Sequence, residues 1–159
     1  MFREMRRKNQ LLPKEEAEAI LKNNTMGVLA LSGDDGYPYA VPMSYVYDNG
    51  RIIFHSAKSG HKIDAIEGCD KASFCVVDKN DIVPQEYTTY FKSIIAFGRI
   101  HIVREKSEMI SALHLLGEKY NPGHHSECRE EIDKFINNVA VLILDVEHIT
   151  GKAARELLK

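Results

Sequence analysis

The chain has 159 residues, of which 44% are hydrophobic and 28% charged, and its formal net charge at pH 7 is -2. This length and composition are typical of a single globular domain, residues 1–159, and the charge leaves no basic footprint for nucleic acid. No apolar run approaches the roughly 20 residues of a membrane-spanning helix, so we expect neither a membrane nor a nucleic-acid partner.

The N-terminal segment MFREMRRKNQ is basic, as at the start of a signal peptide, but the charged LLPKEEAEAILKNN follows it instead of an apolar stretch. The cysteines Cys69, Cys75 and Cys128 are odd in number and form no CxxC pair. Because this pattern does not suit a disulfide framework, we expect a cytoplasmic protein.

The first regular element is expected to be a short amphipathic helix. Pro13 suits the first turn of a helix, and Ala17, Ile20 and Leu21 then share one face. The helix should end near Asn23.

Strand-like segments follow, separated by the turn-like SGDDG and DNG. Since proline donates no backbone hydrogen bond, Pro38 and Pro42 predict an edge strand or a bulge. Later in the chain, Gly98 predicts a bend or bulge within a long strand. The expected strands are MGVLAL, YPYAVPMSYVY, RIIFHSA, KASFCVVD, TTYFKSIIAFGRIHIV and VAVLILDVEHITG.

Three further segments have helical spacing, namely SGHKIDAIEG, EKSEMISALHLLGEKY and SECREEIDKFINN. Hairpins at short spacing, with helices mostly outside the strand series, favour an antiparallel barrel of about six strands or an α+β arrangement. The chain contains neither a GxGxxG motif nor a P-loop motif, which argues against a parallel nucleotide-binding sheet.

The end of the strand Arg51–Ala57 and the residues after it contain the parts of an anion site. Ser56 supplies a hydroxyl, Ser59 and Gly60 allow a tight turn, and Lys62 adds a positive charge at the start of a helix. Free amides and the helix dipole favour a phosphate in such a place. The alternative is an ordinary connection in which Ser59 caps the helix and Lys62 faces solvent.

The succession GYPYAVPMSYVYDNGRIIFHSAKSGHKIDAI, followed by KASFCVV and IIAFGRIHIV, resembles the flavin-binding split barrel of the pyridoxamine phosphate oxidase-like superfamily. Its Nim-type nitroimidazole-resistance branch is the closer match, and MRRK and ITGKAA are also similar to that branch. The resemblance implies a mainly β fold with flanking helices, an antiparallel FMN-binding split β-barrel. It also implies a homodimer with FMN bound between two protomers.

The resemblance further implies that the FMN phosphate lies near the SGHK segment and its ring beside the strand Pro42–Tyr45. An irregular strand interrupted by proline leaves backbone groups free for the polar edge of the ring. Tyr45 is expected either to flank the ring or ribityl chain or to point into the barrel. The expected cofactor-binding residues are Pro42, Met43, Ser44, Tyr45, His55, Ser56, Gly60, His61 and Lys62.

His55 is similar to the active-site histidine of Nim-type proteins. An imidazole can donate a proton near neutral pH, so we expect His55 to be catalytic, the alternative being that it only holds the cofactor. The expected function is an FMN-dependent oxidoreductase that passes electrons from an unknown donor to a small-molecule acceptor, as a nitroimidazole or nitroaromatic reductase-like resistance protein. SGHK replaces the arginine-rich phosphate motif of pyridoxamine phosphate oxidase, which argues against vitamin oxidation.

The alternative function is a non-catalytic flavin- or haem-binding split barrel, a sensor or a storage protein, for which His101, His124 and His148 are possible haem ligands. His124 and Cys128 have the i,i+4 spacing of two metal ligands on one helix face. Without a distant partner they make too few ligands for a zinc site, so we expect no metal.

Overall fold

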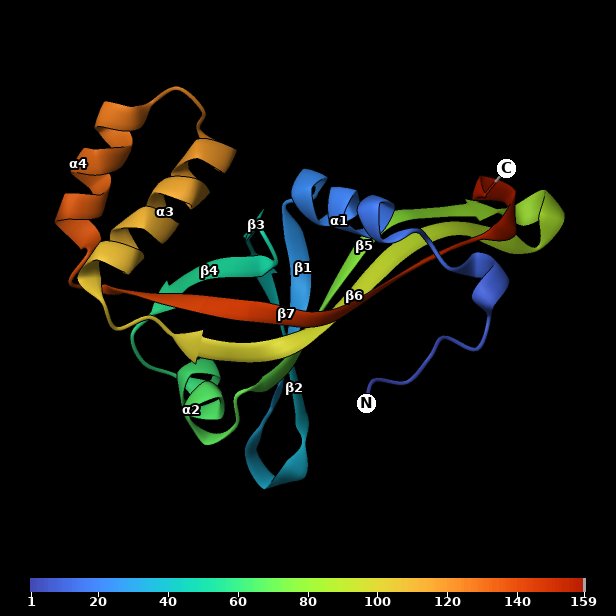
Figure 1. Ribbon diagram of the computed structural model, residues 1–159, viewed down its shortest axis with the longest axis horizontal. Helices are drawn as coiled ribbons and strands as arrows, with labels where there is room; N and C mark the ends of the chain where they lie inside the picture. The colour runs from blue at the N-terminus through green and yellow to red at the C-terminus, as the bar shows by residue number, and fades with distance from the viewer. Residues whose placement is uncertain (159) are drawn as a thin grey trace.

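The computed structural model describes residues 1–158 and contains a seven-stranded sheet in which every pairing is antiparallel (Figure 1). The expected mainly β split barrel is confirmed. A seventh strand arises because the proline-containing run breaks at Tyr45 into two strands. The strands are β1 Met26–Ser32, β2 Pro38–Ser44, β3 Val46–Asp48, β4 Arg51–Ala57, β5 Lys71–Val83, β6 Thr88–Ile102 and β7 Val139–Ala153.

The helices are α1 Lys14–Asn23, α2 His61–Gly68, α3 Lys106–Tyr120 and α4 His125–Phe135, as the sequence predicts. α1 packs against β7, β3 and β6, and α2 lies against β1 and β6. α3 and α4 pack on each other at one end of the sheet, whereas the hairpin of β5 and β6 extends to the other end (Figure 1). Within residues 1–158, no helix has both the length and the apolar character needed to cross a bilayer.

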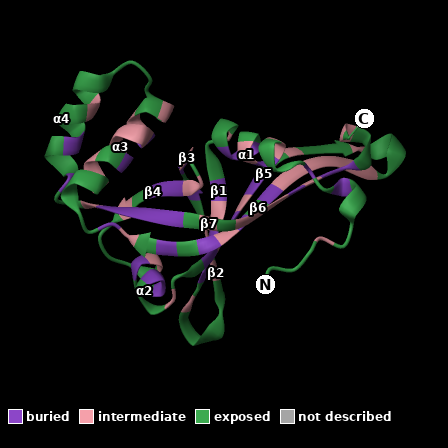
Figure 2. Cartoon of the chain, viewed as in Figure 1, coloured by how far each residue is buried: buried purple, intermediate pink, exposed green. Residues whose placement is uncertain are grey.

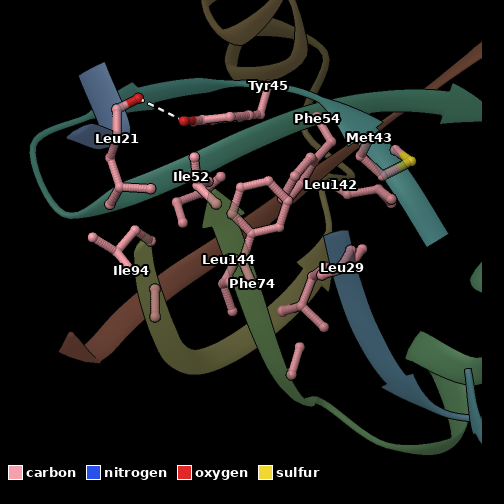
Figure 3. Packing of buried hydrophobic residues seen from close by; sticks show 14 of the residues in the cluster. Leu21, Leu29, Met43, Tyr45, Ile52, Phe54, Phe74, Ile94, Leu142 and Leu144 are labelled. Atoms are coloured by element: carbon pink, nitrogen blue, oxygen red, sulfur yellow. Dashed lines mark hydrogen bonds between the residues drawn. The ribbon is translucent and has the colours of Figure 1, made fainter. Parts of the chain in front are cut away.

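The strand order is β2-β1-β5-β6-β7-β4-β3, which places β2 and β3 at opposite edges of the sheet. A single residue, Tyr45, connects these two strands in the chain. The sheet therefore curls so that the ends of its two edge strands meet at Tyr45, although β2 and β3 are not hydrogen-bonded to each other. The Tyr45 hydroxyl donates a hydrogen bond of 2.8 Å to the Leu21 carbonyl at the end of α1 (Figure 3), and burial raises the pKa of this phenol.

β4 lies between two hydrophobic clusters because its side chains alternate between faces. Ile52 and Phe54 belong to the cluster inside the barrel, where Phe54 and Phe74 meet edge to face with centroids 5.1 Å apart. Ile53 faces the other cluster, which α3 covers. Figure 2 shows the buried residues along β4 and β7, whereas much of α3 and α4 is exposed. β4 thus leads directly from the core to the surface at its end.

Both special positions expected in the strands are confirmed. β2, which carries Pro38 and Pro42, is an edge strand. The pairing of β6 with β7 shifts register between Phe97 and Gly98, as in a β-bulge. A Cβ atom at Gly98 would overlap the Asp145 carbonyl oxygen, so the bulge requires glycine.

Gly98→Ala is expected to lower the free energy of unfolding by about 1–3 kcal/mol, the usual cost of forcing extra atoms into a packed site. Denaturant titration followed by circular dichroism measures the change. Gly68→Ala is the matched control, because nothing lies within 4 Å of a Cβ placed there. Equal stability of the two variants would contradict the packing explanation.

Candidate functional site

The end of β4 presents two polar side chains on opposite faces. His55 is exposed and lines a cavity beneath α3 and α4. By the alternation of the strand, Ser56 lies on the barrel side, after Phe54. Its Oγ atom is buried and has no hydrogen-bond partner within residues 1–158. Since buried hydroxyl groups are nearly always paired, Ser56 has hydrogen-bonding capacity to offer a ligand.

The connection from β4 to α2 leaves the start of the helix uncapped. Gly60 occupies the N-cap position with φ of +118°, and no side chain caps the helix, so the alternative in which Ser59 is the cap is wrong. The Gly60 carbonyl accepts hydrogen bonds from the amides of Ile63 (2.8 Å) and Asp64 (3.2 Å). In the part of the chain that the structure describes, the amides of His61 and Lys62 have no acceptor.

Lys62 itself is half-buried, and its ammonium group forms no ion pair with any of residues 1–158. The positive end of the helix dipole, the two amides and the ammonium group together favour an anion. The amides of His61 and Lys62 and the Lys62 ammonium are therefore unpaired donors within residues 1–158.

The His61 imidazole points elsewhere. Its ring stacks on Tyr39 with centroids 4.0 Å apart, and its Nε2 atom lies 3.7 Å from Asp34 Oδ2 in the turn between β1 and β2. Consequently only the main-chain amide of His61 is free for a ligand at the start of α2.

The β2 edge offers main-chain groups, and its last residue, Ser44, lines the same cavity as His55. Pro42 pairs with Val28 and Ser44 with Met26. Antiparallel pairs alternate between hydrogen-bonded and non-bonded, and Pro42 cannot donate, so we expect the main-chain groups of Pro42 and Ser44 to face the open edge. Pro42 and Ser44 are exposed, whereas the side chain of Met43 is buried in the core.

Tyr45 adopts the inward alternative, with its side chain fully buried in the core. Its main-chain N–H donates a hydrogen bond of 3.0 Å to the Tyr120 hydroxyl at the end of α3. That hydroxyl also lies 2.8 Å from the carbonyl oxygens of Tyr45 and Thr25. Tyr120 thereby ties α3 to the corner between β2 and β3, and Tyr45 has little left to offer a cofactor.

The α3–α4 cavity, of about 640 Å³, lies between the end of β4 and the two helices. Ser44 and His55 line it from the sheet, so the structure brings together two expected site residues from different strands. The sequence did not predict this cavity. The spacing of Leu113 with Leu116, or of Ile132 with Ile136, indicates an apolar face but not what it covers. The apolar lining of the α3–α4 cavity consists of Leu113, Leu116, Ile132, Phe135, Ile136 and Val139, and its polar lining includes Tyr120, Asn121, Glu127, Cys128 and Glu131.

A second cavity, of about 330 Å³, lies next to the first and shares Ile136 and Val139 with it. We call it the basic cavity, because Lys58, Arg104 and Lys106 line it. Its one carboxylate, Glu67, lies 3.3 Å from Arg104. This cavity could not be predicted from the sequence, since its lining residues come from the separate segments 58–67, 102–109 and 136–140.

The other histidines already have neighbours. His101 lies 3.3 Å from Asp145, and His124 lies 3.6 Å from Glu127. The ring of His148 stacks on Phe2, although its Nε2 atom is buried without a partner among residues 1–158. Among those residues, no three His, Cys, Asp or Glu side chains are arranged to hold a metal ion.

Solved structures share this fold at low sequence identity. A putative 5-nitroimidazole antibiotic resistance protein from Bacteroides thetaiotaomicron has a TM-score of 0.75 at 22% identity, over 89% of this chain and 85% of that one. A conserved hypothetical protein from Mycobacterium tuberculosis has a TM-score of 0.83 at 18% identity, over 98% and 94%. An FAD and haem binding protein from Mycobacterium smegmatis has a TM-score of 0.80 at 18% identity, over 92% and 74%.

No curated protein matches the chain in sequence. The family model described as pyridoxamine 5'-phosphate oxidase, however, matches residues 13–153. This range includes all seven strands and the four α-helices. The chain therefore belongs to the pyridoxamine 5'-phosphate oxidase family.

Proposed function

We propose that the protein is a cytoplasmic, homodimeric FMN-dependent oxidoreductase that reduces a small nitroaromatic acceptor, as a nitroimidazole-resistance protein does. The proposal rests on the end of β4. His55 lines the α3–α4 cavity there, and Ser56 and the uncapped start of α2 have hydrogen-bond donors that could bind an anion. Similar structures include proteins described as binding FAD, or FAD and haem, which supports a flavin as the cofactor.

The residues present fit FMN. Ser56 Oγ, the amides of His61 and Lys62, and the Lys62 ammonium would hold the phosphate, because they are unpaired donors near a helix N-terminus. The main-chain groups of Pro42 and Ser44 would bind the polar edge of the ring. When bound, FMN supplies the redox chemistry, and the protein contributes binding, orientation and electrostatics.

His55 is proposed as the proton donor. Reduction of a nitro group consumes protons at its oxygen atoms. Within residues 1–158, His55 is the one histidine that lines the α3–α4 cavity. A positioned imidazole is the side chain that most often serves as a general acid in enzymes. The apolar walls formed by Leu113 and Leu116 would exclude water from the acceptor.

The homodimer is part of the proposal because the groups assigned to FMN lie at an open surface. Pro42, Ser44 and Gly60 are all exposed in the single chain. A large planar ring held only by one strand edge would remain in water, whereas cofactor sites normally bury most of their ligand. A second protomer would cover it.

Two measurements on freshly purified protein test the proposed function. The visible spectrum should show flavin bands, and the flavin-loaded protein, once reduced under anaerobic conditions, should reduce a nitroimidazole. A flavin spectrum without turnover would favour a non-catalytic binder. A Soret band would favour the haem-binding alternative, which the unpartnered Nε2 atom of His148 supports.

Lys62→Ala is expected to weaken FMN binding by about 1.5–3 kcal/mol, the usual range for a hydrogen bond to a charged group. Ser56→Ala should weaken it less, since a neutral hydroxyl is lost. Fluorescence titration of FMN into the flavin-free variants measures both effects. Lys22→Ala, which removes an exposed lysine from α1, is the control. Unchanged FMN affinity of Lys62→Ala at moderate salt would show that the phosphate binds elsewhere.

A further inference from the structure

The two neighbouring cavities differ in charge. Glu127 and Glu131 line the α3–α4 cavity, none of its lining residues within 1–158 is a lysine or arginine, and its one histidine, His55, lies on β4. The basic cavity has Lys58, Arg104 and Lys106 against one carboxylate. Because Ile136 and Val139 belong to both linings, the change in charge occurs across one apolar wall.

Hydrogen bonds to its carboxylate favour the charged form of Glu127. A hydrogen bond from its own main-chain amide, and a second from the Ser126 hydroxyl, lower the pKa of Glu127. Two basic side chains lie close to the pair: His124 is 3.6 Å from Glu127, and Lys134 is 2.8 Å from Glu131. Both contacts are solvent-exposed and neither basic side chain lines the cavity, so they weaken the carboxylates' effect on a ligand without reversing it.

The walls amplify this charge. Leu116, Ile132 and Ile136 are buried, and Phe135 places an aromatic ring in the lining although it is 55% exposed. Glu127 and Glu131 are themselves 63% and 59% exposed, so solvent screens part of their charge, and the apolar walls strengthen its effect only on the side that faces the cavity. The walls also displace water from a charged ligand. The free-energy cost of this desolvation is compensated only by an opposite charge nearby.

We propose that the α3–α4 cavity selects its ligand by charge: it binds neutral or cationic aromatic acceptors and excludes anionic ones, with Glu127 and Glu131 as the specificity-determining residues. The identification of the ligand as an acceptor rests on the proposed function. The volume of about 640 Å³ lies within the range of small-molecule sites, roughly 300–1,000 Å³. A phosphate ester such as the vitamin in the family's description is thus the wrong substrate for this cavity.

Three nitrobenzenes of nearly equal size test the proposal: para-nitrobenzylamine as the cation, para-nitrobenzyl alcohol as the neutral compound and para-nitrobenzoate as the anion. Calorimetric titration into the purified protein should give affinities at least about tenfold higher for the cation than for the anion, and raising the salt concentration should narrow the gap. The double variant Glu127→Gln, Glu131→Gln should reduce the ratio to below about threefold, because it removes the charge and keeps the shape.

Two further variants locate the effect. Glu130→Gln changes a carboxylate on α4 that does not line the cavity, and it should keep the full cation preference. Phe135→Ala should weaken all three compounds by a similar factor, since it removes wall area without altering charge.

Equal affinity for cation and anion, or a preference unaffected by the double variant, would overturn the inference. These titrations do not depend on turnover. Absence of flavin, or of nitro reduction, would therefore count against the proposed function alone.

Discussion

His55→Ala is expected to take up FMN as the unchanged protein does and to reduce a nitroaromatic acceptor about 10²–10⁴-fold more slowly, the usual contribution of a positioned general acid. The reason is the position of His55, which lines the α3–α4 cavity, whereas the groups assigned to the phosphate begin at Ser56 on the other face of β4. Anaerobic single-turnover reduction by the flavin-saturated variant separates chemistry from cofactor binding.

His101→Ala is the matched control, because His101 is an exposed histidine that lies near Asp145 and does not line the cavity. It should react at the unchanged rate. If His55 only holds the cofactor, His55→Ala will lose FMN affinity but keep its turnover per bound flavin. A wild-type single-turnover rate in the saturated variant would eliminate the catalytic role.

Phe74→Ala is expected to lower the free energy of unfolding by about 3–5 kcal/mol, as for other large-to-small substitutions of a buried aromatic residue. Phe74 is fully buried in the barrel and meets Tyr45 and Phe54 edge to face, with centroids 4.8 and 5.1 Å apart. Its ring also fills the space beside Gly27, where a Cβ atom would overlap it. Neighbours on β1 and β4 and at the β2–β3 corner would border the resulting cavity, so it cannot close easily.

Guanidinium denaturation followed by circular dichroism measures this loss. Tyr87→Ala is the control, since Tyr87 is an aromatic residue that is 98% exposed, and its removal should change stability little. A loss below about 1 kcal/mol for Phe74→Ala would mean that the barrel interior is packed less tightly than such cores usually are.

The sequence predicts those features of the fold that depend on local chemistry. α1 ends at Asn23 as expected, β2 is an edge strand because of Pro38 and Pro42, and the long β6 contains its bulge at Gly98. Each follows from the hydrogen-bonding or steric properties of one or two residues.

Features that depend on distant partners could not be predicted. β5 continues past KASFCVVD to Val83, although Asn80 and Asp81 are poor strand formers, because these residues pair with Phe91 and Tyr90 of β6. The break at Tyr45 likewise depends on α1 and α3, which bind its hydroxyl and its amide.

The candidate site divides in the same way. SAKSGHK predicts a helix start that favours an anion, since this depends on a short contiguous segment, but it leaves Ser59 as an alternative cap, which the structure excludes. The direction of the His61 ring could not be predicted, because Tyr39 and Asp34 in another hairpin determine it. The α3–α4 cavity exists only because β6 and β7 are neighbours in the sheet and bring the helices between them over β4.

The position of β7 in the strand order has a consequence for how the molecule is made. β7 is the last of the seven strands in the chain, yet it lies between β6 and β4, with Ile53 opposite Ile143. During synthesis the β1–β2 hairpin can form early, whereas β4 and β6 must wait, each with an unpaired edge that is open to other chains. Pairing between such distant segments is slow. Aggregation therefore competes with folding until β7 inserts, and only then does the sheet become complete.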